Sequence, residues 1–226
     1  MLKPRKRLVK SKLKEDKLVT FTVNTQMFVN KNSKMLGIGI GAVVVIIIAV
    51  SFFNMSSNSA EIQSTFDEMM ARDAYARGEF DETLTRIDGI LEEYSSTNSA
   101  ASALMLRGRI YQQSGDVSAA EEAYAEVVRK HSSEEYLSFG ANVSLAIIAH
   151  GREDYSLAAD KYIDAVNKNP GHFNAAVALL EAGICLEKVS KYEEAKRTYL
   201  RILKSYLKSR SADKARNNLA ELEFMG

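Results

Sequence analysis

Residues 106–128, LRGRIYQQSGDVSAAEEAYAEVV, hold the pattern that decides the fold. In the second half of this stretch Ala120 is followed after four residues by Tyr124, and an apolar residue comes three positions later. Intervals of three and four residues place side chains on one face of a helix. Gly108 lies in the first half, where a small residue lets two helices pack closely, and Gly115 marks a helix stop between the halves. The stretch therefore predicts a pair of helices joined by a short turn.

The same pattern recurs along the chain at intervals of 37, 38 and 37 residues. The aligned positions are an aromatic residue or valine, at Phe80, Val117, Tyr155 and Tyr192, and the residues after them place an apolar stripe on the second helix of each unit. The turn inside each unit is predicted at Gly78, Gly115, Gly151 and Ser190, of which Gly151 comes two residues early in its unit. A two-helix unit repeated at a fixed period indicates a solenoid.

These residues resemble the tetratricopeptide repeat, in which helix A carries a small residue and helix B carries aromatic and alanine positions. The clearest fits are residues 106–128 and YSLAADKYIDAVNKNP at 155–170, and the resemblance covers about 64–209. The first unit departs from the pattern, with Thr83 in place of the usual Ala. The resemblance implies an all-α fold, a TPR-like α-solenoid of about four helix pairs within residues 61–226. Residues 211–224 are expected to form a C-terminal capping helix.

Composition agrees with an all-helical chain. Only two prolines occur among 226 residues, and the chain is rich in strong helix formers. Cys185 is the only cysteine, so an intramolecular disulfide and a cysteine-based zinc site are excluded. We expect Cys185 to be packed inside a helical layer, and a reactive free thiol is the alternative.

An apolar run precedes the repeats. Residues 35–53, MLGIGIGAVVVIIIAVSFF, contain no charged side chain, and nineteen residues of helix reach roughly 28 Å, close to the thickness of a bilayer core. We interpret the run as a single transmembrane helix. A cleaved secretory signal peptide is the alternative, because Ser57 and Ser59 offer a small-x-small site, although nineteen residues exceed the usual signal length.

Charge is divided unequally around this run. Residues 1–53 carry ten basic and two acidic side chains, a formal charge of +8, whereas the remainder carries 20 basic and 27 acidic side chains, a charge of −7. Basic residues beside a span stay on the cytoplasmic side. We therefore expect a single-pass protein with its N-terminus in the cytoplasm and residues 61–226 outside it, in the periplasm if the membrane is a bacterial inner membrane.

The segments beside the span have simpler roles. Residues 1–34 are interpreted as a basic cytoplasmic arm that sets topology, with a weakly signalled interfacial helix at 18–29. The alternative is an arm that contacts anionic lipid headgroups or the phosphates of ribosomal RNA, although we expect no nucleic-acid partner. Residues 54–60, NMSSNSA, are interpreted as a polar linker. Gly37 and Gly41 form a GxxxG pair against which another membrane helix can pack, although glycine is also common in membrane helices. Homo-oligomerisation is left open.

No catalytic pattern is found. His131, His150 and His172 are far apart in sequence and are each expected at the surface or in a groove. The sequence contains no zinc-protease, serine-hydrolase or phosphate-loop motif, so we expect no enzyme activity, no metal site and no cofactor.

The concave face that helix A residues line in this repeat family is the candidate site. It is expected to be polar in the N-terminal units and apolar in the C-terminal units, which would suit a peptide or an unfolded segment. The alternative is that the C-terminal helix covers the apolar half. The predicted groove residues are Arg72, Tyr75, Met105, Arg109, Gln112, Val143, Ile147, His150, Val177, Leu180 and Ile184.

The layout as a whole, a basic arm, one span and an extracytoplasmic repeat domain, resembles the bacterial ancillary translocon subunit family. That resemblance implies a membrane-tethered adaptor or holdase-type chaperone near the Sec channel, with translocon subunits and periplasmic chaperones as partners. Two alternatives stay open. One is an envelope-assembly or cell-division scaffold that binds one defined protein, and the other is an enzyme accessory module.

Overall fold

A computed structural model describes residues 17–224, and residues 1–16 of the predicted basic arm lie outside the described residues. The described part of the chain is helical, with ten helices and no strand, as the sequence predicts. The chain divides into two compact units, residues 1–57 and 58–226.

The first unit contains α1 (Lys17–Lys31) and the N-terminal part of α2 (Ser33–Ala76). Helix α1 confirms that residues 18–29 are helical, whereas their position in a membrane interface stays a prediction. The side chains of the apolar run on α2 are exposed, including Ile38 and Ile46.

Helix α2 is longer than expected. The predicted linker 54–60 is helical, and the helix continues to Ala76. The interpretation of these residues as a polar linker did not foresee a continuous helix, because polarity alone does not end a helix. Residues 42–77 contain neither glycine nor proline, and Ser and Asn weaken a helix only slightly. The helix ends where Gly78 supplies a positive φ of 81°.

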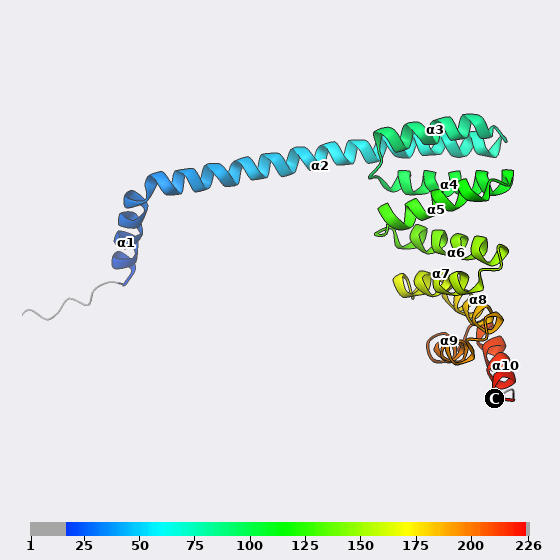
Figure 1. Ribbon diagram of the computed structural model, residues 1–226. Coiled ribbons are helices and arrows are strands. Elements are labelled where there is room, and N and C mark those ends of the chain that lie inside the picture. The colour runs from blue at the N-terminus through cyan, green and yellow to red at the C-terminus, as the bar shows by residue number, and fades with distance from the viewer. Residues whose placement is uncertain (1–16, 225–226) are drawn as a thin grey trace, which may run out of the picture. The chain divides into compact units, whose positions relative to one another are not determined.

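The second unit is a series of antiparallel helix pairs, in which successive helices pack side by side (Figure 1). The C-terminal part of α2 pairs with α3, and three further pairs and a final helix follow. Each helix B begins at the aligned aromatic residue or valine of its unit. The helices are α3 (Phe80–Glu93), α4 (Asn98–Ser114), α5 (Val117–Lys130), α6 (Glu135–Gly151), α7 (Tyr155–Lys168), α8 (Ala175–Lys188), α9 (Tyr192–Ser205) and α10 (Arg210–Phe224).

The core follows the repeats. One cluster joins α2, α3 and α4 around Ile87 and Ile90, and a second joins α4, α5 and α6 around Tyr124 and Val127. The largest cluster joins α6 to α10. Helix α10 buries Ala215 and Leu222 in that cluster, so it caps the last pair as predicted.

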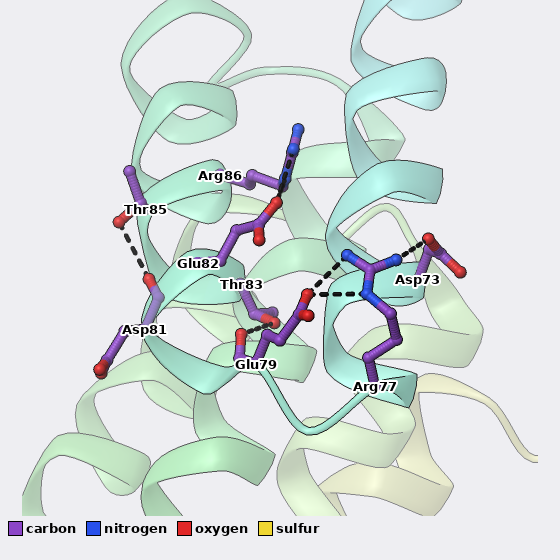
Figure 2. Close-up of polar contacts among 8 residues, drawn as sticks. All are labelled: Asp73, Arg77, Glu79, Asp81, Glu82, Thr83, Thr85 and Arg86. Atoms are coloured by element: carbon purple, nitrogen blue, oxygen red, sulfur yellow. Dashed lines mark hydrogen bonds and ion pairs between the residues drawn. The ribbon is translucent and has the colours of Figure 1, made fainter.

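The first turn is held by a small polar network (Figure 2). Arg77 donates a hydrogen bond of 2.7 Å from Nε to Oε2 of Glu79, and it also pairs with Asp73 one helical turn earlier. The hydroxyl of Thr83 donates 2.8 Å to the carbonyl oxygen of Glu79. The guanidinium of Arg77 lowers the pKa of the Glu79 carboxyl, because its hydrogen bond stabilises the charged form. This network joins the end of α2 to the start of α3.

The third turn differs from the prediction. Gly151 is the last residue of α6, and the residue with left-handed backbone is Glu153, with φ of 61°. Glu153 occupies the same register as Gly78 and Gly115 in the earlier units, whose φ values are 81° and 84°. Ser190 holds this position in the fourth unit, with φ of 59°, as predicted. The repeat register, and not the nearest glycine, therefore fixes the turn.

Candidate protein-binding surface

The predicted groove residues lie on the helix A elements α2, α4, α6 and α8, and ten of the eleven retain exposed surface. Leu180 is the exception, since it is 4% exposed and belongs to the core cluster of α6 to α10. Including Leu180 in the surface was wrong, because in the fourth unit the helix turns this side chain toward neighbouring helices. Its neighbour in the predicted set, Val177, is 47% exposed, so the C-terminal helix leaves part of the apolar half open.

The polar half of the predicted surface lies on α2 and α4, and contacts between these two helices hold its side chains in place. Arg72 pairs with Glu68 at 2.6 Å and donates 3.1 Å to Oγ of Ser102. Gln113 donates 3.0 Å from Nε2 to the hydroxyl of Tyr75. These hydrogen bonds tie α2 to α4, so the polar groups of this half are held in place before any partner arrives.

Arg109 is different from Arg72. Its side chain is exposed, and none of the ion pairs found among the described residues includes it. An exposed guanidinium without a carboxylate partner can bind an acidic side chain or a backbone carbonyl of a bound protein. Arg109 is therefore the one basic group of the predicted set that is available for a partner.

The apolar half lies on α6 and α8. Ile147 is 48% exposed, and Val143 and Ile184 are half-buried at the edge of the core. His150 is exposed, and its ring meets the edge of Tyr155 with centroids 5.1 Å apart. These exposed and half-buried apolar side chains of α6 and α8, together with Val177, are here called the apolar strip.

A further residue of this surface could have been found from the repeat spacing. Glu187 in α8 is the counterpart of Tyr75, Gln112 and His150 in the earlier units. It accepts a hydrogen bond from the Tyr199 hydroxyl, just as Gln112 accepts one of 3.1 Å from Tyr124. In both units a helix B tyrosine fixes a polar side chain at the rim of the helix A face.

The glycines of the apolar run are fully open. A Cβ atom added at Gly37 or Gly41 would meet no atom within 4 Å. The described chain therefore supplies no helix against them, and packing of a membrane helix at this pair stays a prediction.

The histidines form no shared site. His131 is 5% exposed, so the expectation that it lies at the surface was wrong, and burial lowers the pKa of its imidazole. His131 is the first residue after α5, in the connection to α6. Among the described residues no three His, Cys, Asp or Glu side chains lie close enough to hold a metal ion.

A comparison with protein families matches residues 26–222 to the tetratricopeptide repeat-like domain. The chain belongs to this family. The match includes the apolar run as well as the repeats, and it agrees with the helix pairs described above. Tetratricopeptide repeat-like domains bind other proteins, so the chain has a role in protein–protein interaction. A comparison with curated proteins returned no match.

In this tetratricopeptide repeat-like chain, α2 is the helix that is long and apolar enough to cross a membrane, judged by length and composition within the described residues. None of its most apolar 18-residue window is buried, which distinguishes it from a core helix. A signal sequence near the N-terminus would pass the same test of length and composition.

Proposed function

We propose that this protein is a membrane-tethered adaptor of the holdase type, which binds unfolded or extended polypeptide segments near a protein translocation channel. The observation that carries the proposal is the open apolar strip on α6 and α8, with Ile147 48% and Val177 47% exposed in a tightly packed repeat domain. Exposed apolar surface of this kind suits segments of many sequences.

The apolar run supports the tether. Its exposed side chains would be stable in a bilayer, and the +8 charge of residues 1–53 favours a cytoplasmic N-terminus. The repeats would then lie in the periplasm of a bacterial inner-membrane protein, where translocon subunits and chaperones are the expected partners. Tethering raises the local concentration of the strip near emerging segments without any added contact.

Aggregation assays test the holdase function. The full chain in lipid nanodiscs should suppress light scattering by several unrelated unfolded proteins, and Ile147→Glu should remove most of that effect. Leu200 on α9 is 52% exposed and lies outside the helix A face, so Leu200→Glu is the matched control and should behave as the parent. If no substrate is protected, the holdase function is rejected.

Topology has its own test. Cys185 is buried, so a cysteine placed at exposed Lys31 or Gln113 would be the main site for a membrane-impermeant maleimide on intact cells. Labelling of Gln113→Cys from outside, with Lys31→Cys labelled only after permeabilisation, supports the proposed orientation. The reverse pattern contradicts it.

A scaffold that binds one defined protein is the second candidate. The ordered polar half favours it, because Arg72 and Tyr75 are already fixed by Ser102 and Gln113 and so present a specific pattern of groups. A scaffold would protect none of the unfolded substrates and would yield one crosslinked partner.

A further inference from the structure

The connection between α7 and α8 carries an unusually exposed aromatic side chain. Residues 169–174 form this loop, which is longer than the other connections between units. Phe173 is 81% exposed, the highest value among the large apolar side chains of the described residues. A phenylalanine this exposed to solvent does not gain the free energy that burial of its ring would provide.

Hydrogen bonds hold this loop in a fixed shape. Two backbone hydrogen bonds lie within or beside the loop. The N–H of His172 donates 3.2 Å to the carbonyl oxygen of Asn169, and the N–H of Ala175 donates 2.9 Å to the carbonyl oxygen of His172. The hydroxyl of Tyr206 donates 2.7 Å to the carbonyl oxygen of Pro170 from the next connection. Phe173 is therefore presented by an ordered loop.

Four rings contact one another in this region, here called the aromatic cluster, with His172 at its centre: Tyr136, Phe139, His172 and Phe173. His172 stacks on Phe139 with centroids 3.7 Å apart and on Phe173 with centroids 4.4 Å apart. Tyr136 lies 5.4 Å from the same imidazole. Phe139 is 2% exposed, so the cluster is anchored in the core, while Tyr136 is 68% exposed at its outer edge.

The aromatic cluster is uncharged at neutral pH. Burial lowers the pKa of His172, and its Nδ1 accepts a hydrogen bond of 3.1 Å from the N–H of Asn174. An imidazole that accepts at Nδ1 and carries its proton on Nε2 is in the neutral form. The four rings themselves offer no charged partner that would compensate a charged group for the hydration it loses against them.

The aromatic cluster continues the open apolar strip. Tyr136, Val143 and Ile147 are separated by seven and four residues on α6, so they lie on one helical face. Eleven residues of helix between Tyr136 and Ile147 extend about 16 Å. An extended chain covers that length with about five residues.

We propose that the aromatic cluster and the strip on α6 form one site for an extended polypeptide segment of about five residues with uncharged, aliphatic or aromatic side chains. The inference rests on the proposed protein-binding function and adds the chemistry and the anchor of the bound segment. Exposed aromatic rings that are held in place beside an apolar surface are typical anchors, because little entropy is lost when they are covered.

Tryptophan fluorescence tests the anchor directly. The sequence contains no tryptophan, so Phe173→Trp gives a single reporter in the full chain, held in lipid nanodiscs. An octapeptide of Leu, Val and Phe among Ser and Gln should cause a saturable blue shift. A matched peptide with Asp and Lys at the apolar positions should not. Leu207→Trp, at a 62% exposed position in another connection, is the control reporter and should not respond.

Affinity measurements identify the residues that matter. With a labelled apolar octapeptide, anisotropy should show that Tyr136→Ser and Phe173→Ser each raise Kd about tenfold. Both side chains are exposed, so these variants should fold as the parent does, which circular dichroism would verify.

Four results would overturn the inference. Equal shifts with the charged peptide would show that the site does not select uncharged segments. A blue shift that grows with protein concentration in the absence of peptide would show that a second copy covers the cluster. If Ile147→Glu weakens binding while Phe173→Ser and Tyr136→Ser do not, the strip binds without the cluster, and only the proposed function survives. If Ile147→Glu has no effect either, the proposed binding surface fails as well.

Discussion

Gly183 of α8 lies directly beneath the ring of Tyr199 of α9. A Cβ atom added at Gly183 would lie 2.2 Å from Cε1 and 2.6 Å from Cζ of that ring, closer than real contacts allow. The same relationship joins Gly108 to Tyr124 two units earlier, at 2.5 Å. The tyrosine ring of helix B therefore occupies the space that a side chain at the helix A glycine would fill. The absence of that side chain sets how closely the two helices pack.

Gly183→Ala should destabilise the repeat domain. Tyr199 is fully buried and bonded to Glu187 and Asn218, so its ring cannot move aside, and overpacking of a core typically costs about 1–3 kcal/mol. Urea unfolding would measure the loss. Gly89 on α3 is the matched control, because a Cβ there meets nothing within 4 Å. Gly89→Ala should leave stability unchanged or raise it by up to about 1 kcal/mol. Equal effects of the two substitutions would contradict this packing.

The third turn predicts two stabilising substitutions. Glu153 has φ of 61°, a backbone conformation that costs a residue with a side chain about 1–2 kcal/mol. Glu153→Gly should therefore raise the free energy of unfolding by about 0.5–1 kcal/mol, after the greater flexibility of glycine in the unfolded chain is counted. Thermal unfolding would detect the shift. Gly151→Ala should also stabilise, because Gly151 is helical with open space around it. Destabilisation by Gly151→Ala would instead place the turn at Gly151.

Cys185 should be inert in the folded protein. Burial raises the pKa of its thiol to about 11, so at pH 8 about one thiol in a thousand is ionised. A thiol reagent should modify it only after the chain is unfolded. Rapid modification of the native protein would support the reactive-thiol alternative.

The same thiol predicts a loss of stability in alkali. The pKa is raised from 9.0 to about 11 in the folded state, so the unfolded chain releases the proton first. Its contribution is complete below pH 9 and is lost as the pH rises toward 11. Cys185→Ala should reduce this part of the alkaline loss, which unfolding titrations at pH 8 and pH 10.5 would compare.

Much of this fold could be predicted because its signals are local and periodic. The spacing of Phe80, Val117, Tyr155 and Tyr192 identified the repeat and its second helix, and the structure shows each of these residues to be the first of its helix B. Continuity of α2 was not foreseen, since residues 54–60 were interpreted as a polar linker, although they contain no helix-breaking residue. The third turn was predicted at Gly151, whereas the repeat register indicates Glu153, which has the left-handed backbone.

The candidate surface was predicted less completely, because repeat position gives a helical face and not its burial. Leu180 shares the helix A register but is covered by its neighbours, and Glu187 was omitted although the spacing indicates it. The aromatic cluster could not be foreseen, since Phe139 and His172 belong to different units and meet only in the folded structure. Aromatic residues at 136 and 173, which share one repeat position 37 residues apart, were the available signal.

Photo-crosslinking from Ile147 in the intact, membrane-inserted protein tests the central claim most directly. A photoreactive amino acid at Ile147 should capture polypeptide partners in cells, whereas the same group at Leu200, which is equally exposed on α9, should capture few. Translocating segments or channel proteins among the captured partners would support the adaptor function. No crosslinks from Ile147, or an equal yield from Leu200, would contradict the account.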